Sequence, residues 1–235
     1  MGFICANYWL TNFGAIIMAG TVVTTQPAQE PITLQEAKEH LRVEDGIDER
    51  LLRPLIQTAR MFAEEYLGRK LVTTVLTQSY DVANEFEDPL WEGMRVGADI
   101  AYYKNYLTLS HGPVASVNSI NTYDDSDNAT VFASSKYYLD NAREPAKILL
   151  RKGQTWESNL RVANGIEVNY TVGYSSIYSI PEPIRMGILQ HVAHLYEHRG
   201  DMYEASNPYP PMLKTLYAPY VIYKGLGSSS LMAIG

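Results

Sequence analysis

Three histidines near the C-terminal end of the chain come closest, in residue type and spacing, to a metal site. His191, His194 and His198 fall within about 60° of each other on a helix, because each residue adds about 100°. Three imidazoles on one helix face could ligate a metal ion. However, the zinc-protease pattern needs two histidines four residues apart with a suitably placed glutamate, and Glu197 stands at the wrong spacing. We therefore keep the three histidines as weak metal candidates and expect helix packing, a subunit contact or contact with a polyanion instead.

No other motif supplies the residues of a known catalytic or cofactor site. The sequence has no glycine-rich phosphate loop, no dinucleotide-binding fingerprint and no serine in a nucleophile elbow. Residues 124–128 begin like a calcium loop but lack the glycine at its sixth position and the acid at its twelfth. The carboxylates at 64–65 and 85–88 have no evident partner, so we expect solvated faces there. We predict no catalytic residue, no cofactor and no enzymatic activity.

Composition and charge exclude further classes of protein. The 235 residues include 19 Lys and Arg against 26 Asp and Glu, a net charge of −7, which disfavours wrapping nucleic acid through a broad basic face. The single cysteine, Cys5, can form neither an internal disulfide nor a thiolate zinc site. Tyrosine is abundant, with 18 residues against five phenylalanines. This bias is typical both of protein interfaces and of strands.

The hydrophobic period predicts three helices around a block of strands. Thr33 caps a short helix, with Glu36 in the capping-box position. Asp48 is placed to cap a longer helix that ends at Gly68, with Pro54 expected to kink it or delay its start. From residue 71 the period becomes two, and we expect strands within 106–110, 114–123, 131–139, 146–150 and 165–172. A last helix follows Pro181 and ends near residue 200. The apolar positions expected to pack the helices together are Leu52, Leu55, Ile56, Phe62, Ile188, Val192 and Leu195.

This order of elements predicts an α+β fold, with a helical base, an inserted antiparallel β module and an extended C-terminal arm. The predicted boundaries are an N-terminal extension over 1–30, the first part of the helical base over 31–70, the β module over 71–180, the closing helix of the base over 181–206 and the arm over 207–235. Residues 84–105 are a long polar and aromatic insertion to which the sequence assigns no element.

The N-terminal extension carries no charge before Glu30. Residues 3–23 are apolar, but no basic residue precedes them as in a signal peptide, and polar residues and glycines dilute them below a typical membrane span. We therefore expect a poorly anchored or partner-ordered arm and no membrane helix.

The C-terminal arm has no acidic residue, and four prolines interrupt it. Proline spacing of this kind excludes one long helix. Two interpretations stay open: a tail folded back on its own domain, or an arm that lies on another subunit, where tyrosine rings bind at low entropic cost. In the second case Tyr217 and Tyr220 should become buried only on assembly. The candidate contact residues are Tyr209, Leu213, Leu216, Tyr217, Tyr220 and Tyr223.

Four segments taken together resemble the head–tail connector, or adaptor, proteins of tailed bacteriophages and prophages. They are PITLQEAKEHLRVED, LLRPLIQTARMFAEEYLGRKL, GPVASVNSINTYDD and VNYTVGYSSIYSIPEPIRMGILQHVAHLYEHRGD. Each is weak alone, but their order and spacing between residues 31 and 223 are fairly specific. The chain departs from the pattern in its long N-terminal extension, in Ser110-His111-Gly112 where many relatives are proline-rich, and in the 84–105 insertion.

The resemblance implies a non-enzymatic adaptor in the virion neck, assembled in the host cytoplasm and involved in genome packaging, genome ejection and tail assembly. It implies a ring of copies, expected to be a dodecamer, between the portal protein and a stopper or tail-completion protein. The helices would form the ring body, the C-terminal arm would reach onto the portal, and DNA would pass transiently and non-specifically through the channel. An acidic lining would avoid trapping a sliding polyanion.

Two other functions remain as alternatives. A β-sandwich module could bind a ligand or carbohydrate through exposed aromatic residues such as Trp91 and Trp156, although Trp156 is expected in the core of the β module. A metal-dependent enzyme built on the three histidines is the weaker alternative.

Overall fold

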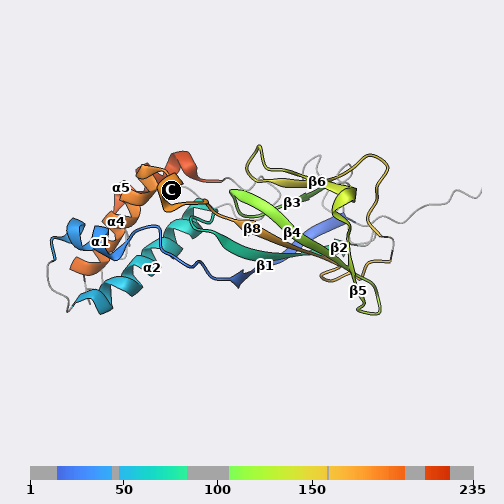
Figure 1. Cartoon of the computed structure of the whole chain (residues 1–235), viewed down its shortest axis with the longest axis horizontal. Helices are drawn as coiled ribbons and strands as arrows, with labels where there is room; N and C mark the ends of the chain where they lie inside the picture. Colours follow the sequence, from blue (N-terminus) through green and yellow to red (C-terminus); the bar gives the residue numbers. More distant parts are fainter. Residues whose placement is uncertain (1–14, 44–47, 84–105, 158, 199–209, 223–235) are drawn as a thin grey trace, which may run out of the picture.

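The computed structural model describes residues 15–43, 48–83, 106–157, 159–198 and 210–222. Its helices gather at one end of an elongated molecule and its β-sheets at the other (Figure 1). The helices are α1 (Leu34–Leu41), α2 (Glu49–Leu67), α4 (Glu182–Glu197) and α5 (Pro211–Tyr217), with short 3-10 turns at Ser134–Lys136, Ile177–Ser179 and Ala218–Tyr220. The mixed α+β class predicted from the sequence is confirmed.

The strands form two antiparallel sheets. The five-stranded sheet has the order β1-β2-β8-β4-β5 and the three-stranded sheet the order β3-β7-β6. The strands are β1 (Ala15–Thr25), β2 (Thr74–Ala83), β3 (Tyr106–Thr108), β4 (Val114–Tyr123), β5 (Ala129–Val131), β6 (Tyr137–Asp140), β7 (Lys147–Leu150) and β8 (Ile166–Val172).

One face of each sheet contributes to a shared hydrophobic core, because alternate strand residues point to the same side. On β8 the buried residues alternate with half-buried ones along the whole strand. Gln78 is fully buried in this core; its side-chain amide nitrogen donates to the Thr108 carbonyl at 3.2 Å, and its Oε1 accepts from the Ser110 backbone N–H at 3.0 Å and the Tyr170 hydroxyl at 3.0 Å. These bonds satisfy a buried amide and tie β2 to β8 and to the segment after β3.

A second hydrophobic core lies between the helices. The Thr33–Glu36 capping box begins α1 as predicted, and Gly68 in the left-handed conformation (φ 66°) ends α2 as predicted. Asp48 makes no side-chain capping hydrogen bond; instead its carboxylate accepts the Tyr196 hydroxyl of α4 at 2.5 Å. Pro54 lies within α2 and does not delay its start, since the helix begins five residues earlier at Glu49.

Residues 15–25 of the N-terminal extension are not a poorly anchored arm. They form strand β1, which pairs along its length with β2 at the edge of the larger sheet. The composition of this segment, AIIMAGTVVTT, is rich in the β-branched residues that favour strands. Residues 1–14 lie outside the described residues.

The segment predicted as one strand over 131–139 is divided in two. Strand β5 ends at Val131, a 3-10 turn covers Ser134–Lys136, and β6 begins at Tyr137 in the other sheet. The chain thus changes sheets at this point. Within the described residues, no helix has the length and apolar character needed to cross a membrane.

Helix α5 folds back on the helical core. Tyr217 is fully buried, and its ring lies 5.8 Å from that of Tyr66 on α2, centroid to centroid. Gly187 of α4 makes room for it, because a Cβ atom at this position would lie 2.4 Å from the Tyr217 ring. The absence of a side chain at residue 187 therefore allows α5 to dock.

Replacing Gly187 with alanine should destabilise the protein. The added methyl group overlaps a buried ring, so we expect the free energy of unfolding to fall by about 2 kcal/mol in spite of alanine's better helix propensity. Urea denaturation of the full chain measures this change. Gly20→Ala is the matched control, since nothing lies within 4 Å of a Cβ at Gly20; equal midpoints for the two variants would contradict the prediction.

Candidate binding surfaces

The three candidate histidines, two on α4 and His198 directly after it, do not form a metal site. His191 is buried, its ring meeting that of Phe62 edge-on at 4.8 Å between centroids, and its Nδ1 has no hydrogen-bond partner among the described residues. The rings of His194 and His198 lie 4.4 Å apart, and His198 is exposed. In the described part of the chain no group of three His, Cys, Asp or Glu side chains could hold a metal ion. The metal hypothesis thus has no geometric support there.

Burial lowers the pKa of His191 to about 4, with a smaller contribution from neighbouring His194. A buried imidazole is neutral because the protein interior solvates its charged form poorly. His191 therefore serves helix packing, one of the roles expected from the sequence.

Glu64 is buried and not, as its sequence context suggested, on a solvated face. Its carboxylate accepts from Arg60 at 3.1 Å, from Lys70 at 2.8 Å and from the backbone N–H of Leu71 at 3.1 Å. Arg60 also pairs with Glu30 at 2.7 Å. This cluster ties the end of α2 to the segment that leads into β2 and to the segment ahead of α1. The carboxylates at 85–88 lie outside the described residues.

The junction between helices and sheets is a second polar cluster. Arg69 pairs with Glu144 at 2.6 Å and donates to the Tyr174 hydroxyl at 3.1 Å, so it joins three distant segments. The Lys70 N–H donates to the Gly112 carbonyl at 2.9 Å. Sequence patterns did not reveal these residues, because the partners lie 42 to 105 positions apart and no local motif relates them.

The C-terminal segment divides at Ile222. Leu213 and Tyr217, expected as contacts to a partner, are instead buried in the chain's own helical core, because α5 seats them against α2 and α4. Ile222 is also buried, and its N–H donates to the Leu67 carbonyl at 2.9 Å. Leu216 and Tyr220 are half-buried beside the same core. Tyr209 and Tyr223 lie outside the described residues.

The helical-base positions expected from the sequence fall in or near this core. Leu52, Ile56, Ile188 and Val192 are buried, and Leu55 and Phe62 pack against them. Leu195 is half-buried and does not belong to the cluster.

The aromatic residues considered for sugar binding offer no platform in the described structure. Trp156 is 7% exposed, and its ring centre lies 4.8 Å from that of Phe132 in the core between the sheets. Trp91 lies outside the described residues.

Acidification should weaken the helical core through His191. The unfolded imidazole titrates near 6.5 and the folded one near 4, so below pH 6.5 only the unfolded chain gains this proton. The stability contributed by the neutral ring is present above pH 6.5 and is lost towards pH 4; at pH 5 we expect a loss of about 2 kcal/mol. Chemical denaturation at pH 7 and pH 5 measures it. In the His191→Phe variant the loss of stability due to this imidazole should vanish. If the variant loses as much stability between pH 7 and pH 5 as the wild type, His191 is not the group responsible.

The comparisons with known proteins agree with this architecture. Residues 31–147, about half of the chain, match the family model of the phage gp6-like head-tail connector protein. No curated protein matched the chain.

Solved structures with a similar fold come from gene transfer agent (GTA) particles. A chain from the neck of the empty GTA particle, computed with C6 symmetry, has a TM-score of 0.65 and 17% identity, with 90% of this chain and 100% of that chain covered. A chain of the native GTA virion has a TM-score of 0.65 and 16% identity, with 88% of this chain and 98% of that chain covered. A chain from the neck of the native GTA particle, computed with C12 symmetry, has a TM-score of 0.60 and 20% identity, with 90% of this chain and 100% of that chain covered. At these identities the likeness establishes a shared fold.

The region that carries the family match runs from just before α1 to the start of β7, and so includes the long α2 helix, the junction and most of the β module. The chain belongs to the phage gp6-like head-tail connector family, a family of structural neck proteins and not of enzymes.

Proposed function

We propose that the protein is an adaptor that forms a dodecameric ring in the neck of a phage-like particle, between the portal protein and a stopper or tail-completion protein. DNA passes through the ring during packaging and ejection. The ring assembles in the host cytoplasm and remains in the virion.

The observation that carries the proposal is the family match over residues 31–147 together with a fold shared along the full length of neck-protein chains. The titles of those structures describe necks computed with C6 and C12 symmetry, and twelve copies are compatible with both. A closed ring needs heterologous contacts, in which two different surfaces of each copy meet.

The charge of the chain supports a channel that DNA crosses without being held. The net charge of the chain is −7. A protein with this negative charge repels DNA phosphates on average and does not retain them. A channel wall of this average charge would let DNA slide through the ring.

The contact with the portal is assigned to the chain after Ile222. Leu213, Tyr217 and Ile222 are buried in the protein's own core, so they are not free for a partner while α5 is docked. Leu216 and Tyr220 are half-buried against the helical core and are proposed as the base of the arm. Tyr223 is the next aromatic residue in the sequence.

Electron microscopy of the tagged full chain, purified with whatever accompanies it from its natural source, tests the proposed function. We expect rings stacked on portals or at the necks of particles. Particles whose necks lack the tagged chain would contradict the adaptor role.

Two truncations test the arm. Removing residues 223–235 should leave the described fold intact and abolish binding to the purified portal, measured by co-sedimentation. Removing residues 207–235 also removes α5 and with it the buried side chains of Leu213, Tyr217 and Ile222. The free energy of unfolding should then fall by about 3 kcal/mol or more. Portal binding undiminished in the shorter truncation would show that the arm assignment is wrong; the longer truncation alone would not separate lost binding from lost stability.

A further inference from the structure

The outer face of the three-stranded sheet presents a row of aromatic and apolar side chains. Strand register places Leu107, Ile148 and Leu139 opposite one another, and the first two are buried in the core. Because side chains alternate between faces, the neighbouring row of Tyr106, Leu149 and Tyr138 lies on the other side. Tyr138 is 45% exposed.

Two cationic side chains lie over rings of this row, and a third lies over Phe132, which is buried in the core. The Lys147 ammonium lies 4.1 Å from the Tyr106 ring centre, the Arg151 guanidinium 6.0 Å from that of Tyr138, and the Lys136 ammonium 4.8 Å from that of Phe132. Lys152 follows in an exposed turn. Among the described residues none of these four cations forms an ion pair with a carboxylate. We call Lys136, Tyr138, Lys147, Arg151 and Lys152 the basic face.

The basic face stands out against an acidic chain. Residues 134–152 contain five Lys and Arg against two Asp and Glu, a net charge of +3. The whole chain carries −7, so the rest of it carries −10. The surface that complements the basic face is therefore abundant on a second copy of the same protein.

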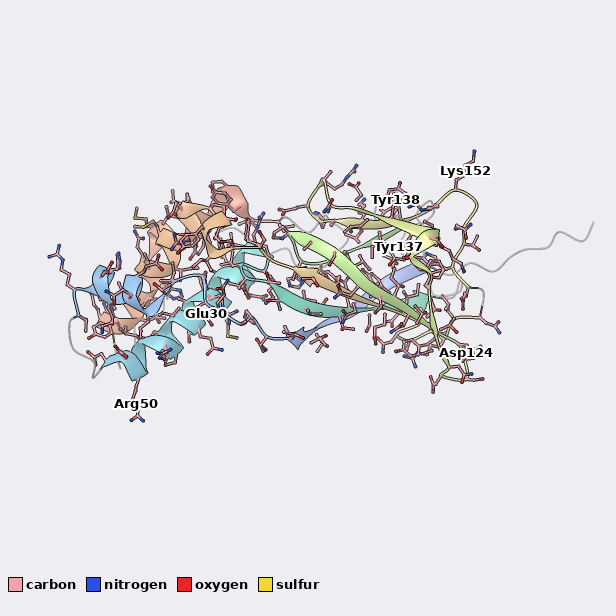
Figure 2. The ribbon with its side chains drawn as sticks, viewed as in Figure 1. Glu30, Arg50, Asp124, Tyr137, Tyr138 and Lys152 are labelled. Carbon is pink, nitrogen blue, oxygen red and sulfur yellow. The ribbon has the colours of Figure 1, made fainter. Side chains whose placement is uncertain are left out.

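An acidic turn lies on the opposite side of the β module. Figure 2 shows Tyr138 and Lys152 along one border of the module and Asp124 along the other. Asp124 is used within the turn, where it accepts the N–H groups of Ser126 and Asn128, each at 2.9 Å. Asp127 pairs with Arg161 at 2.8 Å, and Asp125 is exposed. The turn is thus pre-ordered and still carries surplus negative charge.

We propose that the basic face of one copy docks on the acidic turn of the next copy around the ring; this inference rests on the proposed function. Two different surfaces on opposite sides of one module make the heterologous contact that closes a ring. Complementary charges orient the approach and determine the register, while Tyr138 and Arg151 are residue types that anchor interfaces.

Duplex DNA is a poorer occupant of the basic face. The bases of a duplex are stacked inside it, so the tyrosine row would contact nothing it recognises, and phosphate binding would need only the cations. The exposed Tyr138 and the half-buried Tyr106 and Leu149, with cations beside them, resemble instead the composition of a protein interface.

Charge exchange between the two surfaces tests the contact. Arg151→Glu with Lys152→Glu should weaken self-association of the full chain ~10-fold or more, and so should Asp125→Lys. A chain carrying all three changes restores opposite charges across the contact and should return to within about threefold of the wild type. Sedimentation over a range of concentration and salt measures association, which should weaken as salt rises.

Arg50→Glu is the matched control, because Arg50 is exposed at the far end of the helical base and away from both surfaces (Figure 2). Carbodiimide cross-linking of mixed light and isotope-labelled chains provides the second measurement. We expect links between residues 124–128 of one copy and 136–152 of another.

Several results would overturn the inference. Rings that form normally in the Arg151→Glu, Lys152→Glu chain, or intermolecular links confined to other segments, would refute this contact and leave the adaptor function standing. Retention on duplex DNA lost in that variant, with association unchanged, would assign the basic face to nucleic acid instead. A wild-type chain that neither associates nor occurs in rings on particles would refute both the contact and the proposed function.

Discussion

The close approach of Gly173 to Val72 is the contact on which the two-part architecture depends. The chain leaves the helices through residues 68–72 and returns to them after β8, and the two crossings lie side by side. Gly173 has φ 102°, and a Cβ atom there would lie 2.3 Å from the Val72 carbonyl oxygen. Any side chain would push the crossings apart. The helical base and the β module would then lose the parallel pairing of Val72 with Tyr174 that holds them in one orientation.

The charged clusters around these crossings serve the same orientation. Glu64 receives two cations and a backbone N–H, and Arg69 reaches both Glu144 and Tyr174. Buried ion pairs add little net stability, because desolvation offsets their attraction, but removing one partner is costly. Their effect is therefore to disfavour other arrangements of the two parts. In the proposed ring such rigidity would matter, since a tilt of the module relative to the base would be repeated in every copy.

The last described residues pack against the helices and against the junction between base and module. Helix α5 closes the helical core, and Ile222 packs over the junction, where a Cβ atom at either Gly68 or Gly112 would lie 3.3 Å from it. The described part of the chain thus ends at Ile222, at the place where base and module meet.

By itself the sequence determined the order of the elements, the capping box of α1, the glycine stop of α2 and the alternation of β8, because each follows from contacts between residues a few positions apart. It also carried the family resemblance. Only the tertiary structure decided that Glu64 is buried, that Asp48 binds Tyr196 in place of capping, that Tyr217 belongs to the chain's own core and that residues 15–25 form an edge strand. Each of these outcomes depends on partners far away in the chain, and periodicity and local motifs contain no information about such partners. The basic face is likewise a tertiary feature. Its cations are visible in the sequence, but the fold places Lys147 and Arg151 beside the half-buried Tyr106 and the exposed Tyr138, on the side of the module opposite the acidic turn.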